Sequence, residues 1–149
     1  MIRGVLFDMD GVLVDTEEYI CRAAMEMFRE KGIIASPGDF LPFVGMGENR
    51  YIGGVAEKHG LTIDIVEAKG RTYEIYGIIA KGNIVPLPGA AEFVRRCRRS
   101  GLRLALATSA DRIKMEINLR EAGFPENDFD ATVNGLEVER KKPFPDIYL

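Results

Sequence analysis

The stretch Val5-Leu6-Phe7-Asp8-Met9-Asp10-Gly11, near the start of the 149-residue sequence, decides the fold. Residues 2–7 form a short, mostly apolar run that stops at an acid, which is typical of a buried parallel strand. Residues 102–107 repeat the pattern and stop at Thr108, and residues 131–134 give a third, weaker candidate. We therefore expect a sheet of parallel strands.

Helical patterns separate these strands. Apolar residues recur at helical spacing in residues 20–28 and 90–97, and residues 111–122 form a further helix. We expect Asp15 to cap the first of these helices and Asp146 to cap one that begins at Ile147. The order indicates an α/β fold with an insertion after the first strand.

The insertion covers residues 16–87, which contain helix-like runs but little strand signal. Residues 49–59 and 66–79 are two of those runs. We expect residues 16–87 to form a small helical cap domain, and residues 1–15 together with 88–149 to form a Rossmann-like core.

Composition excludes several classes of protein. Hydrophobic residues make up 46% and charged residues 29% of a chain with net charge −3, so the chain should fold and has no general attraction to nucleic acid. No apolar run approaches the roughly 18 residues that a membrane-spanning helix needs, and the start of the sequence does not look like a secretory signal.

The Cys and His content favours a reduced compartment and argues against zinc. The two cysteines, Cys21 and Cys97, do not make a disulfide framework, which favours the cytoplasm. With His59 as the single histidine, a Cys/His zinc site of the usual kind is excluded.

Polar residues gather where the predicted strands end. Asp8 and Asp10 follow the first strand, Thr108 follows the second, and Lys142 follows the third after a short loop. In an open parallel sheet, ligands bind beyond the carboxyl ends of the strands. We therefore expect these four side chains to share one site.

This set of residues suits phosphoryl transfer. An ionised carboxylate such as Asp8 can attack phosphorus, while a second acid such as Asp10 protonates the leaving oxygen and later activates water. Thr108 and Lys142 can stabilise the phosphoryl oxygens. A hard cation that accepts one or two carboxylates, namely Mg²⁺, would offset the negative charge. Gly11 allows a close approach of the backbone.

Each residue by itself also has an ordinary structural interpretation. Asp pairs at strand ends are often turn formers, and Thr108 or Ser109 could simply cap the following helix. Arg112 opens that helix, where it could touch phosphate or lie at the surface. The joint placement of the polar residues at successive strand ends favours the functional interpretation.

Three segments together resemble the haloacid dehalogenase-like hydrolase superfamily. Residues 5–16 resemble its first signature, and Leu104-Ala105-Leu106-Ala107-Thr108-Ser109 resembles the second. Residues 142–149, Lys-Pro-Phe-Pro-Asp-Ile-Tyr-Leu, are similar to the third as found in the β-phosphoglucomutase-like subgroup. The resemblance spans the whole chain.

The resemblance implies specific roles and a mobile helical cap over the site. It makes Asp8 the nucleophile, Asp10 the general acid and base, and Thr108 and Lys142 the stabilising groups. Mg²⁺ would be held by the Asp8 side chain and the Asp10 carbonyl oxygen. A small phosphorylated metabolite would be the substrate, with contacts expected from a further set of residues: Gly11, Ser109, Arg50 and Arg112.

Two departures from the family pattern stand out. The family has a fourth, acidic signature that supplies further Mg²⁺ ligands, and residues 1–149 do not contain it, so the sequence corresponds to the first two-thirds of such a hydrolase. Mutase members carry a cap histidine where this sequence has Ile20. Their cap arginine is also displaced, and Arg50 would serve only after a shift in register.

These observations leave several functions open. The first hypothesis is a Mg²⁺-dependent phosphatase that works through an aspartyl phosphate. The second is a sugar-phosphate mutase, against which Ile20 speaks. A dehalogenase is a third, but Asp10 favours phosphate chemistry. The alternative from another class is an inactive fragment or binding module, motivated by the absent fourth signature.

Overall fold

The computed structural model of the protein describes residues 2–140 and 142–149. The chain divides into two compact units. One comprises Met1–Thr16 and Gly82–Leu149, and the other comprises Glu17–Lys81.

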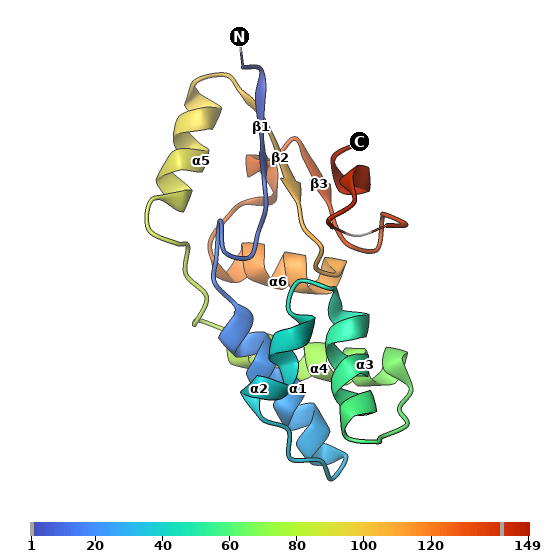
Figure 1. Ribbon diagram of the computed structural model, residues 1–149. Helices are drawn as coiled ribbons and strands as arrows, with labels where there is room; N and C mark the ends of the chain where they lie inside the picture. The colour runs from blue at the N-terminus through green and yellow to red at the C-terminus, as the bar shows by residue number, and fades with distance from the viewer. Residues whose placement is uncertain (1, 141) are drawn as a thin grey trace. The chain divides into compact units, whose positions relative to one another are not determined.

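The first unit contains a three-stranded parallel sheet, in which β2 (Arg103–Ala107) lies between β1 (Gly4–Phe7) and β3 (Ala131–Val133) (Figure 1). In the register, Phe7 pairs with Leu106. The carboxyl ends of all three strands therefore lie at one edge of the sheet. This arrangement confirms the predicted α/β fold with a Rossmann-like parallel core.

Two helices belong to this unit, and the first of them is clearly amphipathic. These are α5 (Ala90–Arg99), which buries Val94 and Cys97, and α6 (Arg112–Glu121). Two short 3-10 helices, Glu126–Asp128 and Pro145–Tyr148, complete it.

Aromatic packing fixes β1 against its neighbours. The ring of Phe7 makes edge-to-face contacts with Phe93 at 5.9 Å and with Phe129 at 6.0 Å between centroids. Such pairs contribute about 0.5–1.5 kcal/mol beyond the burial of apolar area. They hold the end of β1, and with it the residues that follow Phe7.

The second unit is entirely helical among its described elements: α1 (Glu17–Glu30), α2 (Pro37–Phe40), a 3-10 turn (Leu41–Phe43), α3 (Glu48–Lys58) and α4 (Ile65–Ala80). The predicted apolar stripe of α1 is confirmed, since its five members are buried: Ile20, Ala23, Ala24, Met27 and Phe28. Asp64 caps α4 by accepting hydrogen bonds from the backbone N–H groups of Val66 and Glu67.

The observed division of the chain differs from the expected one by Thr16 and residues 82–87, which lie with the first unit. Backbone pairing explains the difference. The N–H of Leu87 donates to the carbonyl oxygen of Leu13 at 2.8 Å, and Val14 bridges Pro86. The returning chain is therefore tied to the segment after β1 before α5 begins.

Two capping predictions were wrong. Helix α1 begins at Glu17, so Asp15 lies one residue too early to cap it. Asp146 lies inside the 3-10 helix Pro145–Tyr148, and its carboxylate accepts hydrogen bonds from Arg140 at 2.8 and 3.0 Å instead of capping a helix that starts at Ile147. The partner of Asp146 is a residue that a local capping pattern does not consider.

None of the described helices combines the length and the apolar character that crossing a membrane requires.

Candidate active site

The end of β1 places Asp8 where the sheet opens. The main-chain N–H of Met9 donates to Asp8 Oδ1 at 2.8 Å, and Lys142 Nζ lies 2.8 Å from Asp8 Oδ2. The same ammonium donates to the carbonyl oxygen of Ala107 at 3.2 Å. Because Ala107 is the last residue of β2, Lys142 joins the ends of two neighbouring strands and faces the acid.

The turn after β2 places two hydroxyl groups at the same edge. Thr108 is buried, and its Oγ1 accepts a hydrogen bond from the N–H of Ala110 at 3.1 Å. Its hydroxyl proton can still be donated to a ligand. The Oγ of Ser109 is buried and has no hydrogen-bond partner among the described residues. A buried hydroxyl without a partner is unusual in proteins, and an anionic oxygen at this edge would satisfy it.

Asp10 has a different set of partners. Lys114 Nζ lies 3.0 Å from Asp10 Oδ2, and the hydroxyl of Thr16 donates to Asp10 Oδ1. The two acids, Asp8 and Asp10, are therefore each matched with a different lysine. The pattern of strand ends did not indicate Lys114 or Thr16, because neither follows a strand.

Gly11 forms the tight turn that carries the chain away from the acids. Its φ of +76° lies in the left-handed region, and its N–H donates to the carbonyl oxygen of Val14 at 2.8 Å. A side chain would be strained there. The structure thus accounts for a glycine at this position by the turn itself, and its contact with a ligand remains a prediction.

The two arginines expected to bind substrate have other contacts. Arg50 belongs to the second unit, where Nη1 pairs with Glu57 at 2.8 Å and the guanidinium stacks on Phe43. Arg112 is exposed, and its Nε donates to Glu116 Oε1 at 2.7 Å. The structure does not show either one beside Asp8.

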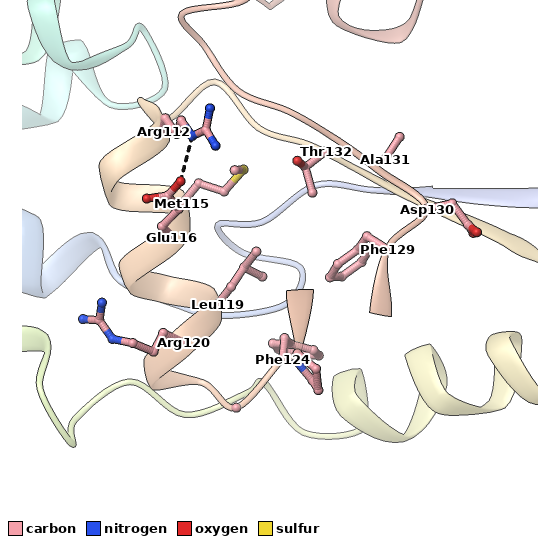
Figure 2. Close-up of a pocket in the computed structure, with 12 residues that line it drawn as sticks. Arg112, Met115, Glu116, Leu119, Arg120, Phe124, Phe129, Asp130, Ala131 and Thr132 are labelled. Carbon is pink, nitrogen blue, oxygen red and sulfur yellow. Dashed lines mark hydrogen bonds and ion pairs between the residues drawn. The ribbon is translucent and has the colours of Figure 1, made fainter. Parts of the chain in front are cut away.

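Arg112 instead lines a separate pocket of about 780 Å³ between α6 and β3 (Figure 2). Figure 2 shows Met115 and Leu119 of α6 facing Phe129 and Thr132 across this pocket. Its lining includes none of the residues at the strand ends that were predicted to be catalytic. The pocket is therefore distinct from the candidate site.

The donor set at the strand ends suits a hard cation only in part. No group of three or more His, Cys, Asp or Glu side chains gathers anywhere in residues 2–140 and 142–149. The Asp8 carboxylate, 40% exposed, and the Asp10 carbonyl supply oxygen ligands of the kind that Mg²⁺ accepts while it keeps several waters. These residues would fit a Mg²⁺ ion that keeps several of its waters, and the described residues do not form a cage around it.

A sequence model of the haloacid dehalogenase-like hydrolase family matches residues 2–149. The chain belongs to this family. One similar curated protein is SUPPRESSOR OF QUENCHING 1, chloroplastic, from Arabidopsis thaliana. The two sequences are 45% identical over a match that covers 99% of this chain and 14% of the Arabidopsis protein. The protein CbbY of Rhodobacter capsulatus is 35% identical over 99% of this chain and 69% of its own length.

Solved structures of this hydrolase family share the fold. A crystal structure of an Asp-to-Asn mutant of CbbY from Rhodobacter sphaeroides, in complex with xylulose-(1,5)bisphosphate, superimposes with a TM-score of 0.88 at 30% identity. The match covers 99% of this chain and 70% of the CbbY chain in that crystal structure. The chain therefore spans about two-thirds of the length of the CbbY proteins and 14% of the length of the Arabidopsis relative.

Proposed function

We propose that the protein is a phosphatase that hydrolyses phosphate monoesters of small metabolites, with Asp8 as nucleophile. The observation that carries this proposal is the contact of Lys142 with Asp8 at 2.8 Å, beside the turn that holds Thr108 and Ser109. A carboxylate, a cation and hydroxyl donors thus follow strands that end at the same edge of a parallel sheet, which is where ligands bind in such folds.

The reaction has two steps. In the first, a carboxylate oxygen of Asp8 forms a bond to phosphorus while the ester P–O bond breaks, and the leaving oxygen takes a proton from Asp10. In the second, water attacks phosphorus, the aspartyl P–O bond breaks, and Asp10 takes the proton of the water. Phosphate leaves, and both acids return to their initial states.

The cationic and hydroxyl groups stabilise charge during both steps. Lys142 offsets charge on the phosphoryl group, and the hydroxyls of Thr108 and Ser109 donate to its oxygens. The Asp8 carboxylate and the Asp10 carbonyl oxygen would hold Mg²⁺, which supplies further neutralisation of the phosphate when it is bound.

Phosphorylated sugars are the substrate class that we propose. The CbbY mutant with the similar fold was crystallised with xylulose-(1,5)bisphosphate. We also propose that Glu17–Lys81 acts as the cap of this hydrolase. The proposed location of the protein is the cytoplasm. A mutase is less well supported, because Ile20, which stands in place of the mutase histidine, is buried in the apolar stripe of α1 and carries no titratable group.

The direct test is the variant Asp8→Asn in the polypeptide of native length, assayed on an aryl phosphate and on a panel of sugar phosphates with Mg²⁺. We expect loss of phosphate release, because an amide cannot form the aspartyl phosphate. Asp64→Asn is the matched control, since Asn also caps helices well. Retained activity in Asp8→Asn would refute the proposal.

The same preparations distinguish the alternatives. Conversion of a hexose 1-phosphate to its 6-phosphate isomer would indicate a mutase, and halide release from a 2-haloacid would indicate a dehalogenase. If the native polypeptide neither turns over any of these compounds nor binds Mg²⁺ and phosphate in calorimetry, the protein is not an enzyme of this type.

A further inference from the structure

A nearly buried lysine contacts the proposed general acid and base. Lys114 lies in the first turns of α6, its side chain is 6% exposed, and its Nζ lies 3.0 Å from Asp10 Oδ2. The ion pair joins residues that are 104 positions apart in the sequence. Lys114 is not one of the polar residues that follow the strands and that the proposed mechanism uses.

The same helix reaches the other oxygen of Asp10 through a second side chain. Asn118, one turn after Lys114 and fully buried, donates from Nδ2 to the hydroxyl of Thr16 at 3.5 Å. That hydroxyl in turn donates to Asp10 Oδ1. Two neighbouring turns of α6 therefore hold both carboxylate oxygens of Asp10, one directly and one through Thr16.

Stability alone does not explain a lysine at this position. Moving an ammonium group out of water costs several kcal/mol, and apolar replacements of buried ion pairs are often neutral or stabilising. Asp10 itself is 36% exposed, so water could solvate its carboxylate without the lysine. The main effect of the Lys114 charge is therefore on the orientation of the Asp10 carboxylate.

We propose that Lys114 is a positioning residue that fixes the carboxylate of Asp10 for proton transfer. This inference rests on the proposed function, in which Asp10 exchanges a proton with the leaving oxygen and with water. Small misplacement of a reacting group can cost about 100-fold in rate. Without Lys114, the Asp10 carboxylate would keep only its contact with Thr16 among the described residues, so it would be oriented less strictly and would meet the reacting oxygen less often. The groups that bind phosphate would be unchanged.

The test compares Lys114→Met and Lys114→Arg in the native-length polypeptide, assayed on an aryl phosphate. Met keeps most of the volume of the buried stem and removes the charge. We expect Lys114→Met to lower kcat by about 10- to 100-fold, with KM and the affinity for inorganic phosphate within about twofold of the parent. Lys114→Arg should recover part of kcat. Lys31→Met is the matched control, because Lys31 also pairs with a carboxylate at 3.0 Å, that of Glu67, in the second unit.

Two further measurements separate positioning from a structural role. The urea midpoint of Lys114→Met should stay close to that of the parent, because the Asp10 carboxylate that loses its partner is 36% exposed and water can solvate it. In an Asp10→Asn background, Lys114→Met should lower the residual kcat no further, because the residue that it positions has lost its function. A drop in stability parallel to kcat, or a full additional loss in the Asp10→Asn background, overturns the inference.

The outcomes also keep the two proposals apart. If Asp8→Asn or Asp10→Asn retains the parent rate, the proposed function fails. If both variants are impaired while Lys114→Met keeps the parent kcat, the proposed function stands and the role of Lys114 is refuted.

Discussion

The ammonium nitrogen of Lys142 lies 2.8 Å from Oδ2 of Asp8, although the two residues lie near opposite ends of the sequence. A second contact at 3.2 Å with the carbonyl oxygen of Ala107 anchors the same ammonium to β2. The side chain of Lys142 is 23% exposed and that of Asp8 is 40% exposed. The pair is thus fixed by the fold and still open to a ligand.

Replacing Lys142 should impair turnover far more than stability. The pair is partly exposed, so its contribution to folding is small, whereas its cation faces the site where charge would develop. We expect Lys142→Ala to lower kcat for an aryl phosphate by about 100-fold or more with little change in the urea midpoint. Arg140→Ala is a suitable control, because Arg140 lies nearby in the sequence but pairs with Asp146. Equal losses in the two variants would contradict the role of Lys142.

The buried hydroxyl of Ser109 offers a second prediction. Because its Oγ has no partner within the described part of the chain, Ser109→Ala should leave stability unchanged or slightly higher. A hydrogen bond to a charged phosphoryl oxygen contributes about 1.5–3 kcal/mol, so phosphate affinity should fall about tenfold or more. Isothermal titration with phosphate measures this, with the exposed Ser100→Ala as control. Unchanged affinity would place the phosphate away from Ser109.

Acid should weaken the fold of the second unit through Asp39. The pKa of Asp39 lies well below its ordinary value of 3.8, chiefly because Lys58 donates to its carboxylate and also because the N–H of Ser36 does. Since the pKa is lower in the folded than in the unfolded state, this carboxylate stabilises the fold above about pH 4 and progressively less as the pH falls below it.

Asp39→Asn should therefore lower stability at neutral pH and flatten the loss on acidification. Urea unfolding followed by circular dichroism between neutral and acid pH measures both effects. Asp64→Asn serves as the comparison, because Asp64 accepts hydrogen bonds only from backbone N–H groups at an exposed helix start. If the stability of Asp39→Asn falls as steeply with decreasing pH as that of the parent, the Asp39 carboxylate is not the cause of the loss on acidification.

Two helical glycines of the second unit should respond in opposite ways to alanine. A Cβ at Gly54 would lie less than 3.0 Å from ring atoms of Phe43, whereas a Cβ at Gly70 meets nothing within 4 Å. We expect Gly54→Ala to cost about 1–3 kcal/mol through overpacking. Gly70→Ala should add about 0.5–1 kcal/mol, since alanine favours the helix. Chemical unfolding of the two variants tests the pair, and a stabilised Gly54→Ala would show that Phe43 moves away freely.

Much of the fold could be predicted from local patterns. The apolar run before Asp8 became β1, although only Phe7 of that strand is buried. The run before Thr108 became β2, in which Leu104, Leu106 and Ala107 are buried. The helical period of residues 20–28 likewise marked the buried face of α1. The caps failed, because Asp15 and Asp146 were assigned from neighbouring residues alone.

The candidate site was predictable only where it follows the strands. Asp8 and Lys142 were expected together and are in contact. Lys114 and Asn118 were missed, since a lysine on a helix is normally solvated and nothing in its local sequence indicates burial. Arg112 shows the reverse case, because the start of a helix suggested a phosphate contact and the side chain pairs with Glu116 instead.

By itself, the sequence determined the family, the parallel sheet and the acids at the end of its first strand, because these depend on short-range patterns of apolar and polar residues. The tertiary structure alone decided which lysine serves which acid. Lys142 meets Asp8 and Lys114 meets Asp10 only because the sheet and α6 bring together segments that are far apart in the chain. Such contacts depend on packing geometry, which no local pattern of residues encodes.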